Sequence, residues 1–188
     1  MKTFITVYLK NKEQVNIGLL KDFFKGVIGN NIKIEEKDNT YSFVFDVFED
    51  MPYADEIASI INYELLISAK LFWAPNFEDL NLLNEYLEMV SRFNFNEEAK
   101  LSFSERDLVI KNIGDKELIK KAILKKYYNT DTENVIKEYL NCDMNISKAS
   151  SILFMHRNTV MNKIDKFIEE TGYDIKKFQD AFIIYHLL

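Results

Sequence analysis

The residues best suited to specific chemistry lie close together near the end of the chain. Arg157 is followed by Asn158, and Asn162 comes one helical turn later. A guanidinium group presents a fork of donors that matches the O6 and N7 acceptors of guanine, and a carboxamide pairs in the same bidentate way with adenine. These side chains at this spacing predict a segment that reads base edges in the major groove of double-stranded DNA.

A second group of polar residues surrounds these three. Hydroxyl and ammonium groups bind phosphate oxygens, which fixes the register of a protein on DNA without reading its sequence. Thr159, Lys163, Ser147 and Lys148 are of this kind. The complete predicted DNA-binding set is Asn145, Ser147, Lys148, His156, Arg157, Asn158, Thr159, Asn162, Lys163 and Lys166.

Two amphipathic helices must position these side chains. Asn145 is a suitable N-cap for the first helix, because its side-chain oxygen can accept a free backbone N–H. Val160, Ile164 and Phe167 place one apolar face on the second helix, and Gly172 suits the left-handed residue that ends it. A short helix, a tight turn and a longer helix are typical of a helix-turn-helix, whose second helix enters the groove.

Each of these residues also has a simpler interpretation. An Arg or Asn on an exposed helix face is more often solvated surface than a base reader, and His156 can simply fill the turn. Asp165 lies near the outward face, where it would repel phosphate. The sequence therefore also allows a protein-interaction module that keeps the helix-turn-helix fold without binding DNA.

Composition limits the class of protein. The 188 residues, 47% hydrophobic, suffice for one large domain or two small ones, and a single cysteine excludes an intramolecular disulfide. No apolar run approaches the roughly 20 residues of a membrane helix, so we expect a cytoplasmic protein without a membrane partner. The net charge is −6, yet 145–167 carries four basic residues against one acidic. This small patch indicates a weakly electrostatic, specific binder, which we expect to be a homodimer.

Upstream, the pattern predicts an α+β fold. The order is strand, helix, β-hairpin and helix, which makes a small α/β sandwich, followed by further helices and an all-α C-terminal module. Asp115 is a predicted helix cap, and Thr130-x-x-Glu133 predicts a capping box. The predicted strands are Phe4–Leu9, Ile32–Lys37 and Tyr41–Phe48, and the predicted helices include Val15–Val27, one from Tyr53 to Leu65 and one from Leu80 to Val90. The predicted domains are 1–94 for sensing or dimerisation, 95–130 as a helical connector and 131–188 for DNA binding.

The segment NISKASSILFMHRNTVMNKIDKFIEETG resembles the C-terminal helix-turn-helix of the PucR and CdaR family of bacterial transcription regulators. The module is also similar to the DNA-binding end of the nucleoid protein Fis. Departures from the family pattern include Asn162-Lys163 in place of Tyr-Arg, and a Lys lacks the forked donors of Arg. The matching residues are Asn145, Ala149, Leu153, His156, Arg157, Asn158, Thr159, Lys166, Thr171 and Gly172.

The resemblance implies a transcription regulator that binds DNA through this module. The upstream order of elements resembles the degenerate GGDEF-like domain of the same family, without its signature, so it implies no cyclase activity. We expect no enzyme and no cofactor, since His156 and His186 have no ligand partners at metal spacing and the five glycines form no phosphate loop. The aromatic residues of 1–94, Trp73 included, allow a pocket for a small-molecule effector, although core packing explains them equally well.

Overall fold

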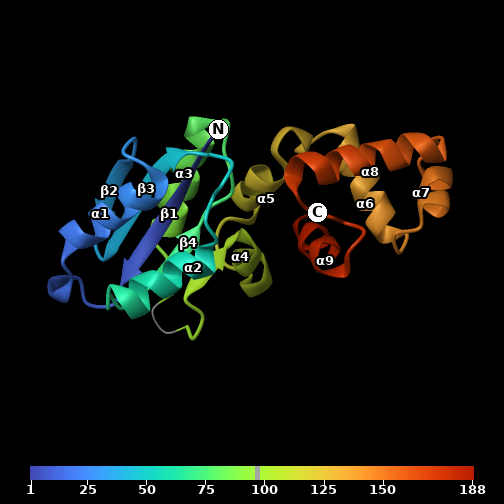
Figure 1. Cartoon of the computed structure of the whole chain (residues 1–188). Helices are drawn as coiled ribbons and strands as arrows, with labels where there is room; N and C mark the ends of the chain where they lie inside the picture. The colour runs from blue at the N-terminus through green and yellow to red at the C-terminus, as the bar shows by residue number, and fades with distance from the viewer. Residues whose placement is uncertain (96–97) are drawn as a thin grey trace. The chain divides into compact units, whose positions relative to one another are not determined.

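A computed structural model of the chain describes residues 1–95 and 98–188. It divides into two compact units, Met1–Leu108 and Val109–Leu188, hereafter the sheet unit and the helical unit (Figure 1). The predicted functional division at residues 94 and 131 stays a prediction, and residues 96–97 of the predicted connector lie outside the described residues. Within the described residues, no helix is both long enough and apolar enough to span a membrane.

The sheet unit is built on five strands in the order β2-β3-β1-β4-β5. Strand β1 is central and buried along almost its whole length, which suits its run of Val, Ile, Phe and Tyr. It pairs antiparallel with β3 and β4, β2 pairs antiparallel with β3, and β5 joins β4 in parallel. The strands are β1 Lys2–Leu9, β2 Lys33–Lys37, β3 Thr40–Asp46, β4 Ala69–Trp73 and β5 Ser102–Ser104.

Helices cover both faces of this sheet. On one face, Ile5 and Val7 of β1 share a core with Phe24 of α1 and Ile57 of α2. On the other, Phe4 lies against Tyr86 of α3, and Tyr8 donates its hydroxyl to the Val90 carbonyl at 2.7 Å. The helices are a 3-10 turn η1 Lys12–Gln14, α1 Ile17–Ile28, α2 Ala54–Ser59 with its π-helical continuation η2 Ile60–Glu64, and α3 Leu80–Ser91.

The predicted α+β class and the predicted β-hairpin are confirmed, whereas strands β4 and β5 were not predicted. The predicted helix from Tyr53 to Leu65 widens into a π turn, within which the Asn62 side chain makes three hydrogen bonds. It donates to the carbonyls of Ala58 and Ala69 and accepts the Ala69 backbone N–H. This amide ties the end of α2 to the start of β4, the strand that the sequence pattern did not reveal.

The helical unit consists of short helices, and capping residues mark the ends of several of them. Asp115 accepts two backbone N–H groups at the start of α5, as predicted. The predicted capping box at Thr130 is wrong in detail, because its hydroxyl donates to the Tyr127 carbonyl and Glu133 accepts the N–H of Asn129. The helices are α4 Glu105–Lys111, which crosses the unit boundary, α5 Lys116–Leu124, η3 Lys125–Tyr127, α6 Asp131–Asn141, α7 Ile146–Ile152, α8 Arg157–Thr171 and α9 Phe178–Leu187.

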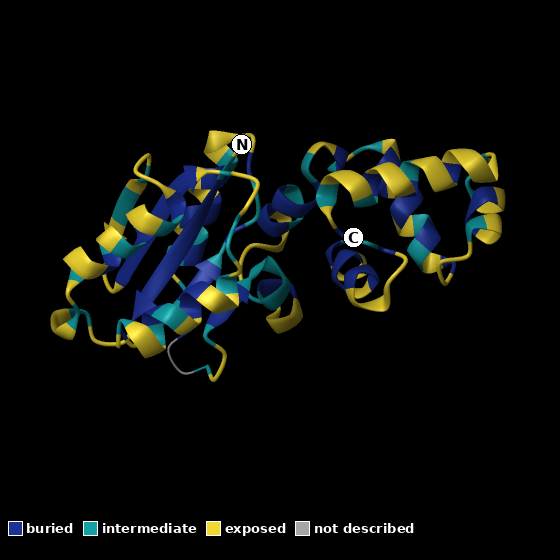
Figure 2. Cartoon of the chain, in the orientation of Figure 1, coloured by how far each residue is buried: buried dark blue, intermediate teal, exposed yellow. Residues whose placement is uncertain are grey.

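The core of the helical unit is built from buried apolar residues of α5, α6, α8 and α9. Val160, Ile164 and Phe167 of α8 are fully buried, and the Phe167 ring lies 5.5 Å from that of Tyr127. Figure 2 shows α8 with a continuous exposed side opposite these residues. The side of α8 opposite its buried residues is therefore exposed within the helical unit.

Candidate nucleic-acid interface

The first helix of the candidate interface begins as its sequence predicts. The Asn145 side chain accepts the backbone N–H of Lys148 at 3.1 Å, which satisfies one of the free donors of the first turn of α7. Ala149 is fully buried and small, so α7 can approach α8 closely. Ser147 and Lys148 remain exposed on the opposite side.

The turn between the helices closes α7 in a Schellman motif. The backbone N–H of Met155 bonds to the Ser150 carbonyl at 3.0 Å, and that of Phe154 bonds to the Ser151 carbonyl at 3.4 Å. Phe154 has a φ of 52°, the left-handed conformation that this motif requires. The turn thus fixes where the next helix begins.

His156 is the N-cap of α8, a role that the sequence analysis did not assign. Its Nδ1 accepts the backbone N–H of Asn158 at 3.2 Å. Because a neutral imidazole accepts through one nitrogen and carries its proton on the other, the capping ring keeps Nε2–H as a donor. Serine, threonine, aspartate and asparagine are the usual caps, so sequence pattern alone favoured a contact role instead.

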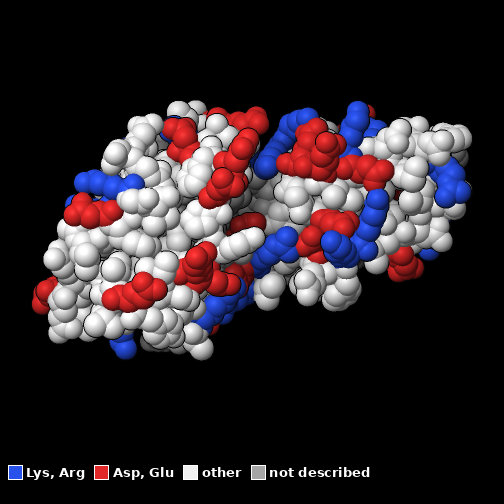
Figure 3. Space-filling model, viewed as in Figure 1, with Lys and Arg blue, Asp and Glu red and all other residues white. Residues whose placement is uncertain are grey.

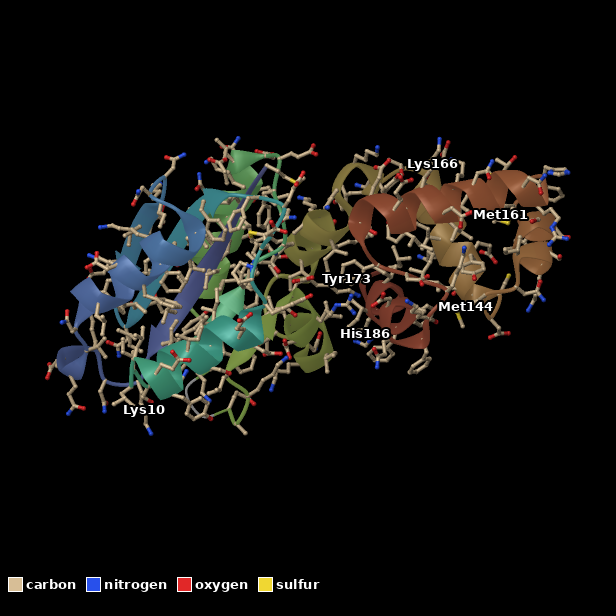
Figure 4. All side chains as sticks on the ribbon, in the orientation of Figure 1. Lys10, Met144, Met161, Lys166, Tyr173 and His186 are labelled. Atoms are coloured by element: carbon tan, nitrogen blue, oxygen red, sulfur yellow. The ribbon has the colours of Figure 1, made fainter. Side chains whose placement is uncertain are left out.

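The orientation of α8 agrees with the predicted periodicity. With its three buried residues turned inward, the polar side chains of its first turns are exposed (Figure 4). Lys163 alone among the predicted contacts on α8 is half-buried, and its ammonium donates to the Thr132 hydroxyl at 3.3 Å. The exposed predicted residues are Asn145, Ser147, Lys148, His156, Arg157, Asn158, Thr159, Asn162 and Lys166, which belong to α7 and its N-cap, the turn and α8.

Comparison with known protein families finds a match for the segment that contains α7 and α8. Residues 134–188 match the family model described as the PucR C-terminal helix-turn-helix domain. This segment is a PucR-type helix-turn-helix domain. It comprises α6 from its second turn, α7, α8 and α9.

Two further likenesses accompany the family match. A 58-residue segment, 31% of this chain, is 33% identical to the uncharacterized protein YxkF of Bacillus subtilis (strain 168), and it spans a fifth of that relative's length. The crystal structure of a regulator of polyketide synthase expression from Bifidobacterium adolescentis aligns with 99% of this chain and 78% of its own, at 12% identity and a TM-score of 0.48.

Asp165, the residue that argued against DNA binding, is neutralised in the PucR-type domain. Its carboxylate forms an ion pair with Lys176 at 2.6 Å. The hydrogen bond that the Lys176 ammonium donates to Asp165 raises the pKa of Lys176, which keeps the ammonium charged. The outward face of α8 therefore carries less negative charge than the sequence of the helix indicates, because the compensating lysine lies eleven residues away.

Charge is divided unequally between the two units. The sheet unit has 11 basic against 19 acidic side chains, a net −8, and the helical unit has 13 against 11, a net +2. Much of the basic excess comes from lysines of α5 and η3, which the sequence analysis had placed in the connector. Figure 3 shows basic and acidic groups mixed over α5 and α8, with further basic side chains near α7. Paired lysines such as Lys120, 2.7 Å from Glu133, reduce the effective excess.

The last helix of the PucR-type domain exposes aromatic side chains. Phe178, Phe182 and Tyr185 of α9 are all exposed, although their rings are largely apolar. With Leu140 and Met144 they line an open hollow of about 360 Å³. The His186 ring stacks on the Phe182 ring, with ring centroids 5.5 Å apart. His186 and Met144 can be located by their labels in Figure 4.

Proposed function

We propose that the chain is a sequence-specific, DNA-binding transcription regulator that acts through α7 and α8. The observation that carries the proposal is the orientation of α8. Its buried seam leaves Arg157, Asn158 and Asn162 exposed at the helix start, where the recognition helix of such a motif meets base edges. The family match of residues 134–188 supports the same assignment.

Each exposed side chain then has a distinct contact. Arg157 reads a guanine through its forked donors, and Asn158 and Asn162 pair with adenines. Hydroxyl and ammonium groups of α7 and α8 bind phosphates, and the Nε2–H of His156 is a further phosphate donor. The proposed phosphate-binding set is the exposed residues Asn145, Ser147, Lys148, His156, Thr159 and Lys166, together with the half-buried Lys163.

The acidic sheet unit complements this role. A net charge of −8 repels phosphate, so the sheet unit serves dimerisation or sensing of a small-molecule effector rather than DNA contact. As a homodimer the protein would bind two half-sites, and its operator would be a palindrome. It would act in the cytoplasm, where it meets the chromosome.

Selection of bound fragments from a random DNA pool, at stated salt, tests the proposal. We expect one common sequence, and Arg157→Ala should weaken binding to it by about 1–3 kcal/mol. Arg92→Ala is the matched control, because Arg92 is an exposed arginine of the acidic sheet unit. Lys166→Ala should reduce the slope of binding against salt by about one unit.

Absence of a common sequence, together with unchanged binding by Arg157→Ala, would overturn the proposal. The alternative is then a protein-interaction module that retains the helix-turn-helix fold. The exposed aromatic residues of α9 favour this alternative, since Phe178 is 77% exposed and Tyr185 57%. Co-purification that recovers a protein partner and no nucleic acid would support it.

A further inference from the structure

Phe154, in the turn between α7 and α8, is the most exposed of the described large apolar side chains. It is 97% exposed, so its ring takes part in no core of the helical unit. Its backbone hydrogen bond closes α7, but that bond needs no side chain. The aromatic ring is therefore unexplained by packing.

The backbone of Phe154 makes the choice of residue more unusual. The left-handed conformation is one that a bulky side chain rarely adopts, and glycine or asparagine fits it with little strain. The same position at the end of α8 is filled by Gly172, with a φ of 78°. The chain thus uses glycine at one of these two helix ends and tolerates a strained aromatic residue at the other.

What distinguishes the two sites is their neighbourhood. Phe154 precedes the N-cap His156 by two residues and the predicted guanine reader Arg157 by three. Since the N-terminal residues of a recognition helix contact base edges, the proposed function would bring this turn close to the major groove, beside the start of α8. The apolar group that DNA presents in that groove is the C5-methyl of thymine, and phenylalanine is among the side chains that contact it.

We propose that Phe154 is a specificity-determining residue that packs its ring on a thymine methyl group at the edge of the binding site. The inference rests on the proposed function of α8. It adds an apolar contact to an interface otherwise made of hydrogen bonds and charges.

Deoxyuridine substitution tests the contact, because deoxyuridine differs from thymidine only by the missing methyl group. Each thymine of the selected site is replaced in turn, and binding is measured with the full chain and with Phe154→Gly. Phe154→Gly should bind the thymine site about fivefold or more weakly. One thymine should be coupled to Phe154, so that its replacement weakens the natural chain and leaves Phe154→Gly unaffected.

Stability measurements separate this effect from misfolding. Phe154→Gly and Phe154→Asn should melt at the same temperature as the natural chain or higher, since both relieve left-handed strain. Phe178→Ala, which removes another exposed phenylalanine of the helical unit, should leave DNA affinity unchanged.

Wild-type affinity in both folded Phe154 variants would overturn the inference. So would an undiminished deoxyuridine penalty in those variants at every thymine. In either case Arg157→Ala still reports on α8 itself. Loss of binding by Arg157→Ala would leave the proposed function intact while the thymine contact is rejected.

Discussion

Each unit has its own core, but the two units differ in how much of their structure is specified by signals local in the sequence. In the sheet unit, partners are distant in sequence, as in the stacked rings of Phe24 and Phe43, whose centroids are 4.0 Å apart. In the helical unit, much of the structure is specified locally by caps such as Asp115 and Asn145 and by the left-handed Gly172. A long-range core is disrupted by one truncation, whereas loss of a single cap removes only a small part of the stability.

Truncating a stacked aromatic residue should have the largest effect. Phe24→Ala removes a fully buried ring from the core between α1 and the sheet and should lower the free energy of unfolding by about 3–5 kcal/mol. Leu19→Ala, at a position of the same helix that is 43% exposed, should change it by only about 0.5 kcal/mol. Urea denaturation followed by circular dichroism measures both.

Hydrogen exchange would show where the loss occurs. We expect Phe24→Ala to reduce protection in β1 and β3 more than in α8. Equal loss of protection in α8 would contradict the separation of the two units.

Removing a cap should have a smaller, local effect in the helical unit. Asp115→Ala leaves the backbone N–H groups of Glu117 and Leu118 without their acceptor and should cost about 1 kcal/mol. Asp115→Asn keeps an acceptor oxygen and should restore most of the stability. If the asparagine variant unfolds as readily as the alanine variant, the cap does not explain the effect.

Removing the hydroxyl group from each of two buried tyrosines of the sheet unit should change the stability of the protein in opposite directions. Burial raises the pKa of both Tyr8 and Tyr86, so both hydroxyls stay neutral. Within the described residues the Tyr86 hydroxyl has no hydrogen-bond partner, whereas that of Tyr8 donates to the Val90 carbonyl. Tyr86→Phe should therefore stabilise the protein and Tyr8→Phe destabilise it, each by about 1 kcal/mol. Thermal unfolding of the pair checks the sign, and destabilisation by Tyr86→Phe would indicate a partner for its hydroxyl.

The smallest predicted effect concerns charge in the helical unit. Lys176→Ala removes the cation that neutralises Asp165 and should weaken DNA binding about threefold at low salt, with little effect at high salt. Lys177→Ala removes an equal charge from the Asp174 pair and is the control. Equal losses in both variants would mean that only the net charge matters, not the neutralisation of Asp165.

Sequence patterns predicted the two helices of the helix-turn-helix well because the signals for their ends and faces are local. The Asn145 cap, the buried seam of α8 and Gly172 all appear as predicted. In the sheet unit the pattern missed β4, since a short apolar run before Pro75 is as consistent with a buried helix as with a strand. Strand β5 has three residues, too few for any periodicity.

Within the candidate site, the exposure of the polar residues was predictable and their partners were not. The helical period alone turns Asn158 and Asn162 outward. The pairing of Asp165 with Lys176, and of Lys163 with Thr132, depends on how α8 packs against neighbouring segments. The left-handed backbone of Phe154 was likewise hidden, because the usual indicator of that conformation is glycine.

The outermost strand of the sheet bears on how two copies of the protein can associate. Strand β2 reads Lys-Ile-Glu-Glu-Lys, so four of its five side chains are charged. Adding a further strand beside it would crowd and desolvate those charges, a common way for proteins to prevent open-ended sheet extension. At the opposite margin, β5 offers only three residues for pairing. The charged side chains of β2 therefore disfavour edge-to-edge pairing of two copies at the β2 margin of the sheet.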